Sequence, residues 1–562
     1  MFGYSITING STPTKKEDIV YKNIVCSNYM INKFEQDKVF SETKEFILLL
    51  DGVVLNKKEL TENEAHSWRD TILTLYKKEG EIFFRKLRGS FSGALYDKIQ
   101  DRWIIFGDQI GSKFTYYAKV GDFFCCSEVM GYMYDLMRDN EIKYHLSKEN
   151  AFLLLTYGYM LDDRTLCEEV HKINPGCYIT YENGVITEKQ YYLLDNRADT
   201  SIDERQAIEI VDKYFRQAVI REFEKDIEYG YKHLVALSGG LDCRMTSFVA
   251  HDCGYERQLN MTFSQTDYWD QTLPMRMARD MCHEWIFKAL DNGMWLYDVD
   301  EVTKTTGGNV LYYGAAHGNS LLKYLNFEAL GLSHSGQIGD VVIGSFIRAS
   351  EKNNPYKLGE KAYSTKYLNH LGNFQLKLDV NAEIGKFYYR AFHGTNNGLQ
   401  NVYNYTETLS PFLDLDLLEK ALSIPVELRQ NHRIYKKWIL EKYPQAAKYE
   451  WETTGRKINS PVLRIGDREL PVANIPKSIN AHIRMVFGIK ERPNSAKGMN
   501  PIAYYLNYNS ELNKYLDGYF SFIDRIEDEE LRNALIDIKT GGTSMEKIQA
   551  VSLLAAIKLF FS

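Results

Sequence analysis

The chain has 562 residues, of which 44% are hydrophobic and 25% charged, a balance typical of a globular protein with about two to four domains. Its net charge of −7 gives no basic footprint for nucleic-acid binding, and no apolar run is long enough to cross a membrane. The eight cysteines are scattered without Cys-x-x-Cys spacing, and no signal peptide is visible, so we expect neither a zinc site nor disulfides, and a cytoplasmic location.

Residues 1 to about 195 are rich in strand-like runs. Residues 46–50 form an apolar run that ends at the turn signal Asp51-Gly52. Further strand pairs are expected at 88–97 with 103–108, and at 113–117 with 123–128. This pattern predicts an antiparallel β-sandwich, which on these residues alone could be without chemistry of its own.

Four stretches of this region resemble the class II glutamine amidotransferase domain, an Ntn-hydrolase-like fold, in the same order: LDGVVLNKKEL, LRGSFSGALYD, GDQIGSKFTYY and CCSEVMGY. That family uses a Cys directly after the initiator Met as its nucleophile, and here Phe2 stands there. Its oxyanion-stabilising Asn-Gly pair is replaced by Asp51-Gly52, which puts a negative charge where donors are needed. Residues 28–40 contain no arginine to hold the glutamine carboxylate. The departures imply a degenerate domain that does not hydrolyse glutamine.

From about residue 205 the pattern changes to alternating strands and helices, beginning with an amphipathic helix at 202–224. The apolar run 234–237 then ends at Ser238-Gly239-Gly240, and helical spacing starts at Asp242. Paired glycines let the backbone approach a ligand, and a helix N-terminus favours a phosphate. Asp242 beside a phosphate requires a bridging cation, for which Mg²⁺ is expected. The alternative is a tight turn without a ligand.

The string Ser-Gly-Gly-Leu-Asp after four apolar residues resembles the pyrophosphate loop of the ATP pyrophosphatase superfamily, which cleaves ATP between its α- and β-phosphates. The resemblance implies ATP and Mg²⁺ as cofactors. It assigns nucleotide binding to the residues of the loop: Leu237, Ser238, Gly239, Gly240, Leu241, Asp242 and Cys243. Cys243 replaces the family's usual Ser, so one hydroxyl donor is missing.

Residues 259–263 read as the next parallel strand and 273–283 as its helix. Ligands of open α/β sheets lie beyond the carboxyl ends of the strands. We therefore expect Thr262 and Phe263 to border the adenine side of the pocket, with an ordinary packed aromatic as an equal alternative for Phe263.

A second glycine loop lies at 332–344 and contains Gly336, Gln337, Gly339 and Asp340. It resembles the asparagine synthetase stretch SGEGxDExxGG. On that match Asp340 is the second Mg²⁺ ligand, paired with Asp242 across the pyrophosphate, and Gly336 and Gly339 line the nucleotide site. The family's loop Glu, thought to help deprotonate the amine, is Gln337 here, and the Glu after the Asp is Val341. β-Lactam synthetases and lasso-peptide cyclases also vary at this place.

Residues 380–470 are expected to be helical and to contain two further family-like segments. Residues 406–414 resemble E-x-R-x-P-F-L-D, with Glu407 kept and Leu409 in place of the Arg. Residues 454–461 resemble the lysine-bearing loop of these enzymes, in which a lysine balances charge on the α-phosphate in the transition state. We favour Lys457, with Arg456 one residue earlier as the alternative. A solvated basic turn is the plainer interpretation.

Residues 470–562 are expected to form helices, with an amphipathic helix at 544–561 packed on the synthetase domain and a polar loop at 491–498. The predicted fold is mixed α/β and α+β: a degenerate amidotransferase-like domain at 1–200 and an asparagine synthetase-like ATP pyrophosphatase domain at 201–562. Its candidate catalytic residues are Lys457, Gln337 and Glu407, and its candidate metal ligands are Asp242 and Asp340.

The resemblance implies an ATP-dependent amide ligase that adenylates a carboxylate and releases pyrophosphate and AMP. The carboxylate could belong to a small molecule, a sugar or a peptide, and the amine to free ammonia, another compound or the same substrate, as in a cyclase. Two alternatives stay open, a binding protein without turnover and an ordinary asparagine synthetase using ammonia or glutamine. A homodimer is considered as well.

Overall fold

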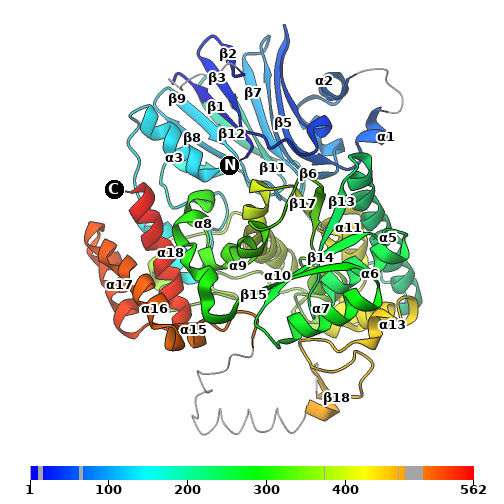
Figure 1. The fold of residues 1–562 in the computed structure, drawn as a ribbon. Coiled ribbons are helices and arrows are strands. Elements are labelled where there is room, and N and C mark those ends of the chain that lie inside the picture. Colours follow the sequence, from blue (N-terminus) through cyan, green and yellow to red (C-terminus); the bar gives the residue numbers. More distant parts are fainter. Residues whose placement is uncertain are drawn as a thin grey trace.

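The computed structural model describes residues 2–10, 17–61, 67–372, 374–465, 468–474 and 498–561. Its N-terminal part consists of two stacked antiparallel sheets of six strands each (Figure 1). The first sheet has the order β10 (Val170–Lys172), β8 (Tyr116–Val120), β9 (Phe123–Ser127), β1 (Tyr4–Ile8), β3 (Ile24–Asn28), β2 (Ile19–Tyr21). The second has the order β12 (Val185–Gln190), β11 (Cys177–Glu182), β7 (Arg102–Gly107), β6 (Gly89–Asp97), β5 (Phe46–Val54), β4 (Val39–Glu42). The expected antiparallel sheets are confirmed.

Strand β5 is buried on both faces, which explains its continuous apolar run. Ile47 and Leu49 point between the two sheets, where they join a core with Trp103. Leu48 and Leu50 point to the opposite face, which α2 (Trp68–Glu79) covers with Ile72 and its neighbours. Helices α3 (Met130–Asp139) and α4 (Lys148–Tyr157) contribute to a separate core with residues of β8 and β9.

The second part contains a parallel sheet of five strands, confirming the predicted change of architecture. Its order is β15 (Glu284–Ala289), β14 (Gln258–Ser264), β13 (Lys232–Ala236), β16 (Leu330–His334), β17 (Thr408–Leu409). The long helix α5 (Glu204–Glu228) opens this part with a capping box at Asp203 and Gln206. Helix α6 (Asp242–Asp252) follows β13, and α7 (Trp269–Asp280) connects β14 to β15. The carboxyl ends of β13, β14 and β16 lie at one edge, as a ligand site in such a sheet requires.

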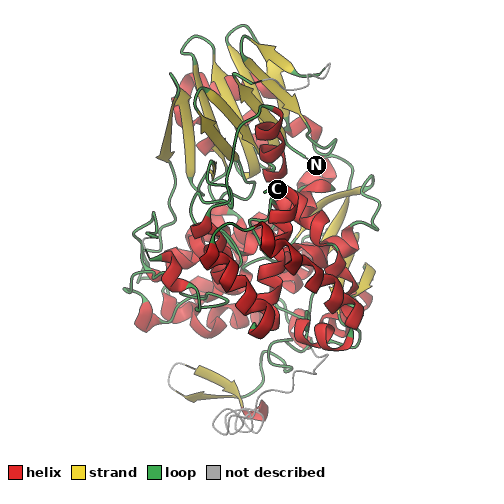
Figure 2. Ribbon diagram, turned by 90° about the vertical axis from the view of Figure 1, so that its left-hand side faces the viewer, coloured by secondary structure: helices red, strands yellow, loops and turns green. Residues whose placement is uncertain are grey.

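Helices make up most of the remaining chain and surround the parallel sheet, while the strands of the first part stand apart at one end (Figure 2). The main ones are α8 (Val299–Thr306), α9 (Tyr312–Leu322), α10 (Ala382–Lys386), α11 (Leu415–Ser423), α12 (Val426–Arg429), α13 (Arg433–Lys442), α15 (Ile502–Tyr508), α16 (Ser510–Gly518), α17 (Glu529–Gly541) and α18 (Ser544–Phe560).

The last helix, α18, packs against both parts of the chain. It lies beside α8 (Figure 1), as expected for packing within the second part. It also contacts the first part, because Gln549 donates to the carbonyl of Leu154 in α4 and Tyr144 donates to the carbonyl of Phe560. One apolar core therefore runs across the two parts and joins them.

Three details differ from the sequence expectation or lie beyond it. The strand expected at 113–117 begins only at Tyr116, because Lys113 and Thr115 belong to the turn before β8. A hairpin, β18 (Val462–Ile465) with β19 (Arg468–Pro471), interrupts the region expected to be helical. The polar loop expected at 491–498 lies outside the described residues except for Gly498. Within the described residues no helix combines the length and apolarity that crossing a membrane requires.

Candidate active site

The loop between β13 and α6 has the form that its sequence predicted. Leu237 and Leu241 are buried and fix its two ends, and the Ser238 hydroxyl accepts a hydrogen bond of 3.3 Å from the N–H of Gly240. A Cβ at Gly239 would lie 3.0 Å from Glu452 Cβ and 3.1 Å from Leu273, so a larger residue there requires these neighbours to shift. The loop opens directly into the N-terminus of α6, where unpaired N–H groups favour an anion.

The two candidate metal ligands lie at the ends of neighbouring strands and are in contact. Asp242 begins α6 after β13, and Asp340 follows the loop after β16. The N–H of Asp340 donates to one carboxylate oxygen of Asp242 at 2.9 Å, and the Tyr435 hydroxyl donates to the other at 2.9 Å. The glycines of the second loop permit this approach, since a Cβ on Gly339 would lie 2.7 Å from the Asp242 carboxyl carbon and one on Gly336 2.2 Å from the N–H nitrogen of Cys243.

The electrostatics of this pair suit a divalent cation. Burial, followed by the charge of Asp340, raises the pKa of Asp242 well above its usual range. Desolvation by the surrounding protein also raises the pKa of Asp340. A bound cation would offset the burial and the Asp340 charge that disfavour ionisation of Asp242, and carboxylate oxygens are the ligands that Mg²⁺ prefers. The donor set therefore fits Mg²⁺, with Asp242 and Asp340 as the residues that would hold it.

Arg244, which the sequence reasoning overlooked, holds the back of the first loop. Its guanidinium is fully buried and donates to the carbonyl of Gly239 at 2.9 Å. Its other acceptors are the carbonyls of Ala446, Tyr449 and Glu450. Burial lowers the pKa of Arg244 to about 10, so the group stays charged at neutral pH. Because these acceptors are carbonyls rather than carboxylates, a positive charge remains directly behind the glycine loop 237–241. In the sequence, the position of Arg244 two residues after Asp242 is the one feature that points to this role.

The candidate lysine loop lies against the same place. The N–H of Glu452 donates to the carbonyl of Gly239 at 3.1 Å, and Trp451 and Arg456 close the turn through a 2.8 Å hydrogen bond. Gly455, with φ of +61°, sits beside the indole ring of Trp269 at the start of α7. Arg456 and Lys457 are both exposed. The structure thus brings the loop to the site, while the choice between Arg456 and Lys457 remains a prediction.

The other predicted nucleotide residues are close to the loop but are held by the protein itself. The Thr262 hydroxyl donates to the carbonyl of Leu237 at 2.8 Å and accepts from the Trp285 indole at 3.0 Å. Phe263 is half-buried with its ring 4.9 Å from that of His317. Burial raises the pKa of the Cys243 thiol to about 11, so it is a neutral group beside the loop.

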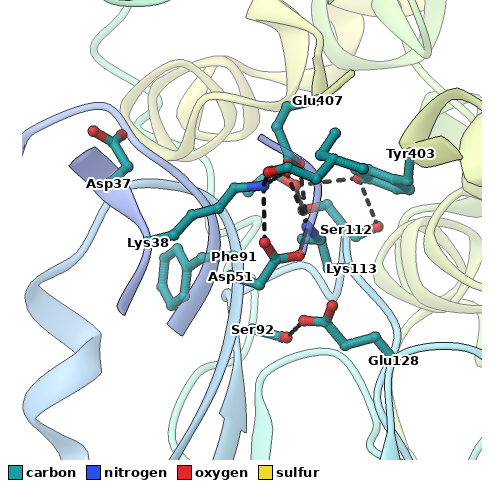
Figure 3. A network of polar contacts seen from close by, with 12 residues as sticks. Asp37, Lys38, Asp51, Phe91, Ser92, Ser112, Lys113, Glu128, Tyr403 and Glu407 are labelled. Atoms are coloured by element: carbon teal, nitrogen blue, oxygen red, sulfur yellow. Dashed lines mark hydrogen bonds and ion pairs between the residues drawn. The ribbon is translucent and has the colours of Figure 1, made fainter. Parts of the chain in front are cut away.

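Two of the three candidate catalytic residues lie in different surroundings. Gln337 is in the Asp340 loop, where its side-chain N–H donates to the carbonyl of Thr395 at 3.4 Å and its side-chain oxygen has no hydrogen-bond partner among the described residues. The contacts of the Glu407 carboxylate are not with the glycine loop 237–241. Its carboxylate turns toward the first part of the chain and joins a buried charge cluster there (Figure 3).

This cluster occupies the region of the amidotransferase-like residues. The Lys113 ammonium donates to the carboxylates of Asp51 and Glu407, and Lys38 pairs with the same two carboxylates at 3.0 Å each. Next to it, Ser92 donates to Glu128 (Figure 3). Burial, then the nearby Asp51 charge, raises the pKa of Glu128 well above its usual range. Lys113 lies in one of the four amidotransferase-like stretches, and Lys38 lies in residues 28–40, where no arginine was found. No local sequence pattern indicates that both lysines pair with Glu407.

Phe2 lies near the Lys113 end of the cluster, with its ring centre 6.0 Å from the Lys113 ammonium, and its side chain carries no nucleophile. Its ring is buried, with 6% exposed, and packs 5.4 Å from the ring of Tyr403. Tyr403 in turn donates to the carbonyl of Ser112 at 3.2 Å. A residue expected to be catalytic in an active glutaminase is here an apolar contact between the two parts of the chain.

Comparisons with known proteins give a family match to part of the chain and several relatives at low identity. Residues 31–192 match the family model of the glutamine amidotransferase domain. The chain is 24% identical over 249 residues to the glutamine-hydrolyzing asparagine synthetase B of Escherichia coli, covering 42% of this chain and 37% of that protein. It is 20% identical over 426 residues to a putative glutamine-hydrolyzing asparagine synthetase of Methanocaldococcus jannaschii, covering 72% and 69%. It is 28% identical over 189 residues to amidase chyE of Penicillium rubens, covering 33% and 26%.

These matches support an asparagine synthetase-like family. The match covers only 26% to 38% of the length of the first three curated relatives. Among solved structures, the glutamine phosphoribosylpyrophosphate amidotransferase of B. subtilis complexed with ADP and GMP is similar at 10% identity with a TM-score of 0.24, covering 51% of this chain and 59% of that chain.

Proposed function

We propose that the chain is an ATP-dependent amide-forming ligase that adenylates a carboxylate and uses an amine not made by glutamine hydrolysis in this chain. The observation that carries the proposal is the contact between Asp242 and Asp340 beside the loop 237–241. A phosphate-binding loop alone would serve many nucleotide proteins. A loop whose first helical residue is a carboxylate, with a second aspartate hydrogen-bonded to it through its backbone, suits a site from which Mg²⁺-bound pyrophosphate departs.

In the first step a substrate carboxylate oxygen attacks the α-phosphorus, and the bond from that phosphorus to the oxygen bridging to the β-phosphate breaks. Bound Mg²⁺ would supply charge neutralisation for the pyrophosphate. The N–H groups at the start of α6 hold phosphate oxygens, and the Arg244 charge behind Gly239 reinforces them. Lys457 is assigned to the α-phosphate, on which negative charge accumulates as pyrophosphate leaves.

In the second step an amine attacks the acyl carbon, AMP departs with the bonding electron pair, and the amine loses a proton. Gln337 stands where the family has a Glu, and an amide does not accept that proton at neutral pH. The chain therefore contributes mainly by placing the amine against an already activated acyl group. Phe2 and the charge cluster around Asp51 support an amine source other than glutamine hydrolysed in the first domain.

Exchange of labelled pyrophosphate into ATP tests the adenylation step. Purified protein with Mg²⁺ and ATP is supplied with mixed pools of small-molecule, sugar and peptide carboxylates. We expect exchange that depends on one of these pools. If no pool supports exchange while the protein also fails to bind Mg²⁺ and ATP, the proposal is wrong and a binding role without turnover takes its place.

A further inference from the structure

The Glu407 carboxylate crosses from the parallel-sheet part into the first part of the chain and lies between two lysines there (Figure 3). Its oxygens are 3.0 Å from the Lys38 ammonium and 3.2 Å from the Lys113 ammonium. The Lys113 and Glu407 side chains are each 1% exposed and that of Lys38 is 6% exposed. Asp51 pairs with the same two lysines, so two ammonium groups face two carboxylates in a nearly dry interface. Such a cluster is held in one geometry, because separating any pair would leave a buried charge uncompensated.

Glu407 also begins a run of contacts that follows the Asp340 loop. Its carbonyl accepts from the N–H of Ser333 at 2.9 Å, and the next two residues form β17, the edge strand beside β16. The carbonyl of Leu409 accepts from the N–H of Ser335 at 2.8 Å. The Ser410 hydroxyl then donates to the carbonyl of Gln337 at 3.1 Å.

This run of contacts ends next to Asp340 and Asp242. Gly339 lies so close to the ring of Phe412 that a Cβ would be 2.6 Å from it. The following residue, Asp340, donates its N–H to Asp242. Residues 407–412 thus form a continuous support along residues 333–339, and the first residue of that support is fixed by Lys38 and Lys113 of the other domain.

We propose that Lys38 and Lys113 are positioning residues that hold Glu407 and, through β17, keep the Asp340 loop in register opposite Asp242. The degenerate first domain then supports the nucleotide site of the second domain mechanically. The consequence for nucleotide binding rests on the proposed function, whereas the consequence for the loop itself does not.

The test compares Lys113→Met and Glu407→Gln with a control, Gln549→Met. Gln549 in α18 is buried and donates to the carbonyl of Leu154 in the first part of the chain at 3.4 Å. Leu154 belongs to an apolar core that contains no residue of 333–344 or 407–412. Hydrogen–deuterium exchange of peptides covering residues 333–344 reports on the loop. Calorimetric binding of Mg²⁺ with α,β-methylene ATP, which is not cleaved between its α- and β-phosphates, reports on the site.

We expect exchange in 333–344 to rise and the dissociation constant to increase about tenfold in Lys113→Met and Glu407→Gln, a size that contiguous networks transmit. Gln549→Met should change neither, and Lys113→Arg should recover part of the loss because it keeps the charge. Unchanged exchange in folded Glu407→Gln, or an equal rise in Gln549→Met, would overturn the inference. If the parent protein does not bind the nucleotide, the proposed function fails, and exchange in the loop still decides the inference.

Discussion

The backbone N–H of Asp340 donates a 2.9 Å hydrogen bond to the Asp242 carboxylate, which ties together the loops that follow two adjacent parallel strands. The hydrogen bond fixes the backbone of Asp340 against the side chain of Asp242. The arrangement is poised for a cation, since the pKa of Asp242 is raised by burial and by the Asp340 charge. Most of the functional account depends on this contact.

The first prediction concerns the two carboxylates. Asp242→Asn or Asp340→Asn should abolish Mg²⁺-dependent binding of α,β-methylene ATP, because each removes charge stabilisation worth several kcal/mol around the metal. Calorimetry measures the binding, and circular dichroism checks that the fold is kept. Tyr435→Phe is a useful companion, because it removes only the hydrogen bond to Asp242 and should weaken binding far less. Metal-dependent binding that survives both Asp substitutions contradicts the assignment.

The second prediction separates Lys457 from Arg456. If Lys457 meets the α-phosphate as pyrophosphate leaves, Lys457→Ala should lower kcat by about 10²–10³ and change the KM for ATP less. Lys457→Arg should restore part of the rate. Arg456→Ala is the matched control in the same exposed turn. If Arg456→Ala loses activity while Lys457→Ala keeps the parent kcat, the loop is assigned correctly but Arg456 is the residue that meets the α-phosphate. Two normal variants would show a solvated turn.

The third prediction concerns glutamine. The purified protein should release no glutamate from glutamine, with or without ATP, because Phe2 has no nucleophile and Asp51 is paired with Lys38 and Lys113. Restoring the nucleophile alone, in Phe2→Cys, should not help, since the charge cluster leaves the oxyanion without its donors. A coupled glutamate assay decides the matter. Steady glutamate release from the parent protein at an ordinary enzymatic rate of about 1 s⁻¹ would mean that another residue has taken over the role.

The fourth prediction is a loss of stability with rising pH that originates at His334. Its Nε2 lies 2.8 Å from Asp226 and its Nδ1 3.2 Å from Glu222. Burial opposes the imidazolium, but the Asp226 and Glu222 carboxylates outweigh it and raise the pKa of His334 to about 9. Burial raises the pKa of Glu222 to about 7.

Both folded-state pKa values lie above the unfolded ones, so both contributions are present at low pH and lost as pH rises through the folded values. For His334 the window runs from about 6.5, the unfolded pKa, to about 9, and the loss amounts to about 3 kcal/mol. Urea unfolding at pH 6.5 and pH 9 measures the change. His334→Gln should flatten the dependence. An equally steep dependence in that variant would show that the pH effect originates elsewhere.

Local patterns in the sequence were sufficient for the elements that depend on local physics. The apolar run before Ser238, the paired glycines and the helical spacing from Asp242 specified strand, loop and helix, and the structure has them. The run at 46–50 was predicted as a strand, but its burial on two faces follows only from the stacking of sheets and helices. The domain boundary near residue 200, between β12 and α5, remains a prediction of the sequence.

Contacts between residues that are far apart in the chain could not be predicted from the sequence. Lys113 and Glu407 are separated by 294 positions, and no periodicity or motif spacing encodes such a pair. Glu407 was therefore assigned to catalysis from its motif, whereas its carboxylate belongs to the interface with the first domain. Arg244 was missed for the related reason that its acceptors are backbone carbonyls, which any sequence provides.

The identity of the products formed from ATP tests the central claim most directly. The protein is incubated with Mg²⁺, ATP and the carboxylate pool that supports pyrophosphate exchange, together with ammonium or a pool of amines, and the nucleotides are quantified. The account predicts AMP and pyrophosphate in equal amounts, and neither product from Asp340→Asn. Formation of ADP and phosphate, or AMP release that persists in Asp340→Asn, would contradict it.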